Sequence, residues 1–204
     1  MSRSLNLSNS ELIEKSVANN ESELTHTGAL LALTGNRTGR SPRDRYIVQE
    51  SSTKDKIDWG EVNRPFDSNH FDKLWNKVSA YLDDKDHYVS NVHVGSNKDH
   101  YIPVEVKSEL AWHSLFSKLI FISPNDFNEE NKEVWKIITA ANYVCDPDDD
   151  HTNSESCVII NFLRRKVLIA GMKYAGEIKK SMFAVQNFLL PEKGVLPMHC
   201  SANH

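Results

Sequence analysis

The sequence lacks a long hydrophobic run. Its longest apolar stretches, residues 29–33 and 167–172, are far shorter than the roughly 20 residues that a membrane span requires. Residues 1–20 also lack the layout of a signal peptide, because they carry Glu11 and Glu14 and have no apolar core followed by small residues. We therefore expect a cytoplasmic protein that does not cross a membrane.

Paired cysteines are absent as well. Cys145, Cys157 and Cys200 form no Cys-x-x-Cys motif, and three cysteines are too few for a disulfide framework in a chain of 204 residues. We expect them to be reduced thiols.

An excess of basic residues is the third feature that is missing. The formal net charge is −4 and the isoelectric point is about 6.1, whereas proteins that bind nucleic acid normally carry a positive excess. This balance argues against a nucleic-acid partner. It still allows a local basic cluster that binds a small anion.

The remaining composition is that of an ordinary globular protein. Hydrophobic residues make up 39% of the chain and charged residues 25%, which is enough to bury a substantial core. Residues 1–194 contain no internal repeat and no linker long enough to divide them into two domains.

Four helices are expected from start signals and apolar spacing. Ser8 and Glu11 have the spacing of a capping box, which predicts a helix that begins after Ser8 and ends in the polar residues 19–22. Apolar residues recur at helical spacing over 68–82. The other two helices are expected at 109–119 and at 177–190, where Pro191 stops the second.

Short runs rich in apolar, β-branched and aromatic residues predict strands between these helices. We expect a buried strand within 27–33 and neighbouring strands on either side of the turn 95–98. The full set of expected strands is 27–33, 46–48, 88–94, 101–106, 119–122, 157–162 and 166–170. The mixture predicts an α/β (α+β) fold with a mixed β-sheet and flanking helices.

The loop 34–45 is the first candidate binding segment. It contains four arginines (Arg37, Arg40, Arg43 and Arg45) and two glycines between two expected strands. Arginine offers a planar fork for carboxylate or phosphate, and glycine lets the backbone approach a ligand. The alternative is a solvated turn in which Arg43 pairs with Asp44. The loop is no nucleotide site, because it is one residue short of a phosphate loop and lacks its lysine.

The second candidate segment is the start of the last expected helix, 174–183. Lys179 and Lys180 stand side by side in its first turn, where the positive end of the helix dipole disfavours cations. An anion or a metal-bound substrate would explain this charge. The alternative is that both lysines extend into water. Gly171 and Gly176 have phosphate-loop spacing, but Glu177 and Ile178 replace the required residues.

Two further stretches contain residue types that can bind metal ions. His199 is a candidate metal ligand or proton carrier, although a lone histidine is more often structural. The acidic run 146–151 does not fit a calcium loop, because His151 stands where glycine is needed and Cys157 where glutamate is needed. We expect this run to be a solvated loop.

Taken together and in order, these stretches resemble one family along nearly the whole chain. The matching passages are Gly-Ala-Leu at 28–30, Thr-Gly-Arg-Ser-Pro-Arg-Asp-Arg-Tyr at 38–46, Trp-Gly-Glu-Val-Asn-Arg-Pro at 59–65, Glu-Leu-Ala-Trp-His at 109–113, Thr-Asn-Ser-Glu at 152–155, Tyr-Ala-Gly-Glu-Ile-Lys-Lys at 174–180, Leu-Leu-Pro at 189–191 and Met-His-Cys-Ser-Ala-Asn at 198–203. The chain is similar to the ATP-type phosphoenolpyruvate carboxykinases, and to the N-terminal, substrate-side domain type of that family.

The resemblance implies a reaction and a set of site residues. Oxaloacetate and ATP would become phosphoenolpyruvate, ADP and carbon dioxide in gluconeogenesis, with Mn²⁺ at the active centre and Mg²⁺ accompanying ATP. Arg40 matches the arginine that binds the oxaloacetate carboxylate or departing CO₂, and Tyr174 lines the same substrate pocket. Lys180 is implied as a catalytic, substrate-binding and metal-ligating residue, with Lys179 in a supporting electrostatic role. His199 is implied as a metal ligand, and Lys180 and His199 both lie in the nucleotide-binding set.

The resemblance also implies a domain boundary. Residues 1–195 would form the substrate-side domain and 196–204 the beginning of a nucleotide-binding domain that supplies the phosphate loop, an aspartate metal ligand and a further arginine. We expect ATP to bind through that domain, and the 204 residues alone to be inactive and to bind no metal tightly. The alternative function is a stand-alone, non-catalytic module that binds dicarboxylate or phosphate.

Overall fold

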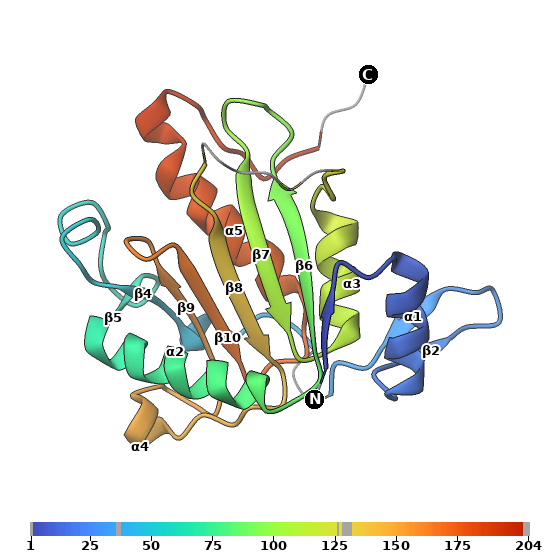
Figure 1. Cartoon of the computed structure of the whole chain (residues 1–204). Coiled ribbons are helices and arrows are strands. Elements are labelled where there is room, and N and C mark those ends of the chain that lie inside the picture. Colours follow the sequence, from blue (N-terminus) through green and yellow to red (C-terminus); the bar gives the residue numbers. More distant parts are fainter. Residues whose placement is uncertain (1, 36–37, 126, 128–131, 202–204) are drawn as a thin grey trace.

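A computed structural model describes residues 2–35, 38–125, 127 and 132–201. In this part of the chain an eight-stranded sheet forms the centre, in the order β1-β6-β7-β8-β10-β9-β4-β5 (Figure 1). Its strands are β1 (Arg3–Leu5), β4 (Arg45–Val48), β5 (Arg64–Phe66), β6 (His87–Val94), β7 (Ile102–Ser108), β8 (Trp135–Ala140), β9 (Cys157–Asn161) and β10 (Lys166–Ala170).

The sheet is mixed. β6 pairs antiparallel with β7, and β9 with β10, as the two turns between these strands predict. The pairs β1–β6, β7–β8, β8–β10, β4–β9 and β4–β5 are parallel. The expected fold class, an α/β mixed sheet with flanking helices, is confirmed.

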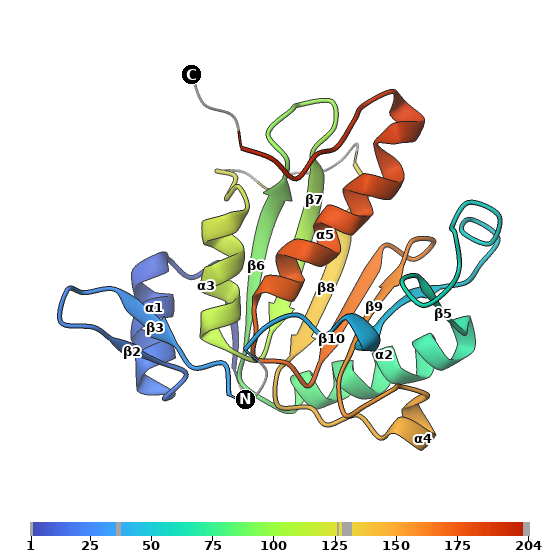
Figure 2. The same ribbon diagram turned by 180° about the vertical axis from the view of Figure 1, so that it is seen from behind.

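Helices cover both faces of this sheet, which Figures 1 and 2 show from opposite sides. α5 (Gly176–Leu189) packs on one face, where Ile178 and Met182 meet residues such as Val167 of β10. α2 (Ser68–Asp83) covers the other face, and its Phe71 joins the core that contains Leu168. Successive residues of the central strands are thus buried on opposite faces, which explains why β9 and β10 are continuous apolar runs.

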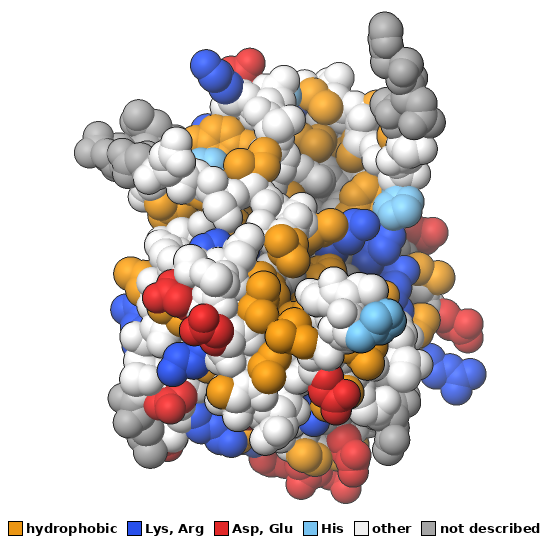
Figure 3. Space-filling view, turned by 90° about the vertical axis from the view of Figure 1, so that its right-hand side faces the viewer, with side chains coloured by type: hydrophobic (Ala, Val, Ile, Leu, Met, Phe, Trp, Pro, Cys, Tyr) orange, Lys and Arg blue, Asp and Glu red, His pale blue; other side chains and the backbone are white. Residues whose placement is uncertain are grey.

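A third core joins two helices at the β1 edge. α1 (Asn9–Ala18) packs against α3 (Ala111–Ile120) through Leu12 and Leu115, both buried. The predicted capping box is present, because Ser8 and Glu11 bond each other reciprocally at the start of α1. Figure 3 shows hydrophobic side chains across the side of the molecule that carries α1 and α3, with Lys and Arg gathered beside a His at one margin. The four expected helices are confirmed, with ends shifted by one or two residues.

A strand does form within 27–33, but the expectation that it is buried is wrong. β3 (Leu30–Ala32) pairs only with β2 (Ser22–Leu24), in a separate two-stranded sheet beside α1. Leu31, in the middle of this strand, is 54% exposed. An apolar run shows a preference for strand, but it does not determine which elements will cover it.

Two other expectations are corrected. No strand forms over 119–122: α3 continues through Ile120, and Ile122 makes a single bridge to His93. The acidic run is not simply a solvated loop. It contains the short helix α4 (Pro147–Asp150), capped by Asp146, and the buried Asp150 pairs with Lys77 at an Oδ1–Nζ distance of 2.6 Å. An aspartate cap followed by proline and acidic residues favours such a turn.

The last helix ends close to the predicted position. α5 gives way at Leu190 to a 3₁₀ turn, Pro191–Lys193, and the chain then runs on without regular structure through residue 201. Among the described helices, none is both long and apolar enough to cross a bilayer. Residues 202–204, the last part of the segment assigned to a second domain, lie outside the described residues.

Candidate active site

A buried carboxylate joins the arginine loop to the start of α5. Glu177 lies in the first turn of this helix and is fully buried. Its Oε1 accepts a hydrogen bond from the Ser41 backbone N–H at 3.2 Å and lies 3.9 Å from Arg40 Nε. Its Oε2 lies 3.8 Å from Arg45 Nε. The loop and the helix start, which are far apart in sequence, therefore form one surface.

Arg40 and Arg45 differ in their access to solvent. The Arg40 side chain is 39% exposed, whereas that of Arg45 is 23% exposed. Burial lowers the pKa of Arg45 from its ordinary value, and Glu177 opposes that shift. Arg40 is thus the arginine of this pair that can meet a ligand. Arg37, which we expected in the same cluster, lies outside the described residues.

A second carboxylate holds the loop from the other side. Asp44 is buried, and its Oδ2 accepts from the Ser41 hydroxyl at 2.6 Å. Its Oδ1 accepts from the Ser154 hydroxyl at 2.8 Å and from the Asn153 amide at 3.2 Å. The alternative of a solvated turn closed by an Arg43–Asp44 pair does not describe this loop, because Asp44 faces inward.

Tyr174 lies directly over the first residue of α5. A Cβ atom at Gly176 would lie 2.5 Å from Tyr174 Cε1 and 2.7 Å from its hydroxyl oxygen, so this ring position requires glycine. Tyr174 is half-buried. The predicted pocket residue is therefore held next to the helix that carries Lys179 and Lys180.

His113 supports the turn that precedes Tyr174. Its Nε2 lies 3.0 Å from the Lys173 carbonyl oxygen, and its Nδ1 lies 3.0 Å from the Thr139 hydroxyl. A carbonyl only accepts, so Nε2 carries the hydrogen and Nδ1 accepts from Thr139. Burial lowers the pKa of His113 to about 4, and the ring is neutral at pH 7. The Gly35 Cα also approaches Lys173, since a Cβ there would lie 3.9 Å from Lys173 Cδ.

Lys180 and His199 meet at one aromatic ring. Lys180 Nζ lies 5.5 Å from the centroid of the Phe183 ring, and the His199 ring packs edge-on against that ring with centroids 5.6 Å apart. Lys180 is half-buried and His199 is exposed. The two predicted metal ligands therefore both lie beside Phe183. No hydrogen bond joins them in the described part of the chain.

The described residues do not complete a metal site by themselves. Over residues 2–35, 38–125, 127 and 132–201, no group of three or more His, Cys, Asp or Glu could hold a metal ion. Two nitrogen donors beside Phe183 fit part of a coordination sphere for a transition metal.

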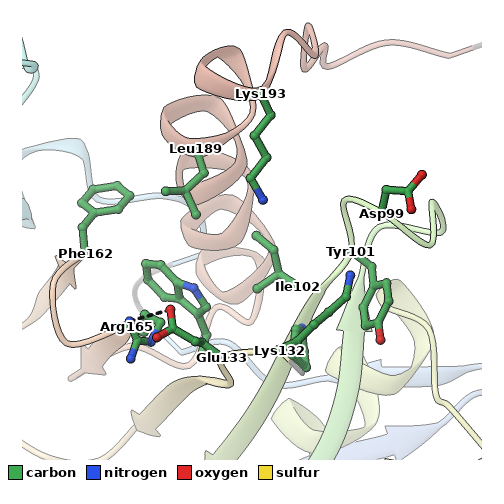
Figure 4. A pocket seen from close by; sticks show the side chains of 11 residues that line it. Asp99, Tyr101, Ile102, Lys132, Glu133, Phe162, Arg165, Leu189 and Lys193 are labelled. Atoms are coloured by element: carbon green, nitrogen blue, oxygen red, sulfur yellow. Dashed lines mark ion pairs between the residues drawn. The ribbon is translucent and has the colours of Figure 1, made fainter. Parts of the chain in front are cut away.

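A cavity lies at the other end of α5. It has a volume of about 470 Å³ and is lined by residues that include Tyr101, Lys132, Trp135, Leu189 and Lys193 (Figure 4). In Figure 4 the side chains of Lys132 and Lys193 point into it from opposite sides. It contains none of the residues predicted for the site. Arg40 and Lys180 therefore lie outside this cavity.

The residues that position this site were not assigned roles by sequence reasoning. Glu177, Asp44 and His113 all stand within passages that carry the family resemblance, but no role could be given to them. The available signal was a charged or polar residue inside an apolar pattern, as for Glu177 before Ile178. Their partners are set by tertiary packing.

Comparison with known proteins gives a consistent result. The model of the family described as phosphoenolpyruvate carboxykinase matches residues 2–204. The chain is 50% identical over 199 residues to the phosphoenolpyruvate carboxykinase (ATP) of Geobacillus kaustophilus (strain HTA426), and 46% identical over 200 residues to that of Bacillus subtilis (strain 168). Each match covers 97% of this chain and 38% of the relative. The chain therefore spans about 38% of the length of these curated relatives.

Proposed function

The chain belongs to the phosphoenolpyruvate carboxykinase family, and we propose that it forms the substrate-side domain of an ATP-dependent enzyme that makes phosphoenolpyruvate from oxaloacetate. In this proposal residues 1–195 are that domain and 196–204 begin the nucleotide-binding domain. The enzyme works in the cytoplasm and serves gluconeogenesis.

One observation carries the proposal. Glu177 joins the arginine loop to the first turn of α5, so the cationic Arg40 adjoins the helix that carries Lys179 and Lys180, and Tyr174 lies over the first residue of that helix. A dicarboxylate such as oxaloacetate carries the opposite charge. Planar, charge-assisted hydrogen bonds from arginine suit its carboxylates.

The reaction has two steps. The bond between C3 and the C4 carboxylate of oxaloacetate breaks, CO₂ leaves, and the electron pair remains as the enolate of pyruvate. The enolate oxygen then attacks the γ-phosphorus of ATP, the bond to the β–γ bridging oxygen breaks, and ADP leaves. Arg40 holds the carboxylate that becomes CO₂, and Tyr174 lines the pocket. Lys180 lies beside the substrate as a neutral metal ligand, and the neighbouring Lys179 supplies positive charge near the enolate.

Lys180 and His199 are the two residues of this chain that would hold a divalent metal. When bound, Mn²⁺ supplies concentrated positive charge to the enolate and phosphoryl oxygens, and Mg²⁺ accompanies ATP. Lys180 has to be neutral to serve as a ligand. The same two residues would also belong to the nucleotide-binding set. A nucleotide loop of the type Gly-x-x-x-x-Gly-Lys-Ser/Thr does not occur in the 204 residues, so we propose that ATP is bound by a part that the longer relatives contain.

A chimaera tests this function. Residues 2–200 of this chain would replace the matched segment of the Geobacillus kaustophilus relative, and the product assay would follow phosphoenolpyruvate formed from oxaloacetate and ATP. We expect turnover by the chimaera and none by the 204 residues alone. A folded chimaera that binds oxaloacetate without turnover would instead favour the non-catalytic binding module. Turnover by the 204 residues alone would contradict the proposed division between two domains.

A further inference from the structure

Glu177 has a role that the family resemblance does not assign. We propose that its buried carboxylate is a positioning residue, which fixes the Arg40 guanidinium beside the lysines of α5. That Arg40 then grips a substrate carboxylate rests on the function proposed above. The positioning itself rests on the geometry of Glu177.

The two oxygens of the Glu177 carboxylate face different arginines. Oε1 faces Arg40 Nε at 3.9 Å and accepts from the Ser41 N–H, whereas Oε2 faces Arg45 Nε at 3.8 Å. Arg45 is the more buried guanidinium and balances the carboxylate from inside. Arg40 is left at the surface with one side held by Glu177 and the rest of its fork available.

The buried ion pair between Glu177 and Arg45 adds little stability. Glu177 Oε2 and Arg45 Nε are both buried and have no hydrogen-bond partner among the described residues. A buried ion pair without good hydrogen bonds recovers little of its desolvation cost, so it contributes little net stability. A carboxylate in this place is better explained by the cation that it orients than by the stability that it adds.

Glu177 is on the same helix as the two lysines. Glu177 lies in the first turn of α5, where the free backbone N–H groups and the helix dipole favour a negative charge. Lys179 and Lys180 follow within one turn on the same helix. By attaching Arg40 to this turn, Glu177 sets the position of the arginine relative to both lysines. A carboxylate on any other element would not do this.

Nuclear magnetic resonance of the 204-residue chain tests the positioning directly. The Arg40 Nε–H signal, assigned from its loss in Arg40→Lys, should exchange with water more slowly than that of a free arginine side chain, because the Glu177 carboxylate 3.9 Å away restrains the guanidinium and repels hydroxide. In Glu177→Gln, which keeps size and a hydrogen-bond acceptor for Ser41, we expect that exchange to become about tenfold faster or more. The matched control is Glu192→Gln, which removes an exposed carboxylate paired with Lys56 and should leave Arg40 unchanged.

A second variant covers the case in which Glu177→Gln does not fold. Arg45→Gln combined with Glu177→Gln replaces both buried charges and leaves neither unpaired, which is far better tolerated than removing one. The same loss of Arg40 Nε–H protection is expected. If Arg40 keeps its protection in a folded form of either variant, Glu177 does not position it and the inference is overturned.

Oxalate, a stable dicarboxylate, separates this inference from the proposed function. In calorimetry of the 204-residue chain, we expect Arg40→Ala and Glu177→Gln each to weaken oxalate binding about tenfold. The double variant should bind oxalate no more weakly than Arg40→Ala alone. Additive losses would show that Glu177 acts independently of Arg40 and would overturn the inference. If Arg40 loses protection in Glu177→Gln but Arg40→Ala binds oxalate normally, the positioning stands and the substrate role of Arg40 fails.

Discussion

The two ends of α5 offer different kinds of binding surface. At the N-terminal end, the buried Glu177 joins the arginine loop to the helix, the buried Asp44 holds that loop from its other side, and Tyr174 lies over the first helical residue. At the C-terminal end, a cavity of about 470 Å³ is lined by apolar side chains such as Trp135 and Leu189 and by charged side chains such as Lys132 and Lys193. What distinguishes the N-terminal end is that buried groups fix its charged residues, because catalysis and recognition depend on positions that are set before the ligand arrives.

The sharpest test of this contrast removes one cation from each end of α5. In the chimaera, Arg40→Lys should lower kcat/KM for oxaloacetate about 100-fold, because a point charge does not replace a planar fork. Lys193→Met, which removes a lysine of the cavity and keeps its length, should change kcat/KM less than about twofold. Steady-state kinetics measures both. A large loss in Lys193→Met would place the cavity in the reaction, and near-native kinetics for Arg40→Lys would remove Arg40 from the site.

The support beneath the N-terminal end should also appear in the pH dependence of stability. The pKa of His113 is lowered from 6.5 to about 4 by burial, so the unfolded chain binds a proton that the folded chain does not between these values. Stability from this group is complete above pH 6.5, falls as the pH drops towards 4 and is constant below. The total loss is roughly 3 kcal/mol.

Urea unfolding at pH 7 and pH 4.5 measures this loss. His113→Gln keeps an N–H donor for the Lys173 carbonyl but does not titrate, so the difference in unfolding free energy between the two pH values should shrink by roughly 2 kcal/mol. His199→Gln, which changes a histidine at an exposed position, is the matched control. An unchanged pH dependence in His113→Gln would show that the ring is not held neutral in the fold.

The sequence predicted most of the regular structure where local signals were strong. α2 follows from apolar spacing, and β9 and β10 follow from two apolar runs on either side of the turn 163–165. β8 is not among the predicted strands, although it lies at the centre of the sheet, because a short run such as Trp135–Ala140 carries little period of its own. The exposure of β3 was equally beyond prediction, since it depends on the elements that pack nearby.

The candidate site divides in the same way. Arg40, Tyr174, Lys180 and His199 were named from the residues and the family resemblance, and their roles stay proposals. Glu177 and His113 could not be assigned because their partners are distant in sequence: Ser41 is 136 residues from Glu177, and Lys173 is 60 residues from His113. Side chains that bind a ligand leave motifs in a sequence. The residues that position them are recognised only when the chain is folded.

The smallest expected effect sharpens the comparison at a single atom. Gly176→Ala adds a Cβ that would lie 2.5 Å from Tyr174 Cε1, so the ring has to leave its place. Tyr174 is half-buried and can swing towards solvent, and alanine is a better helix former than glycine. The free energy of unfolding should therefore change by less than about 1 kcal/mol, while KM of the chimaera for oxaloacetate rises about fivefold, a ratio equivalent to ~1 kcal/mol of binding.

Gly60→Ala is the matched control, because a Cβ there meets nothing within 4 Å. In a Tyr174→Ala background, Gly176→Ala should have no further effect on KM. If it raises KM equally there, the helix start and not the tyrosine ring determines the affinity at this end of α5.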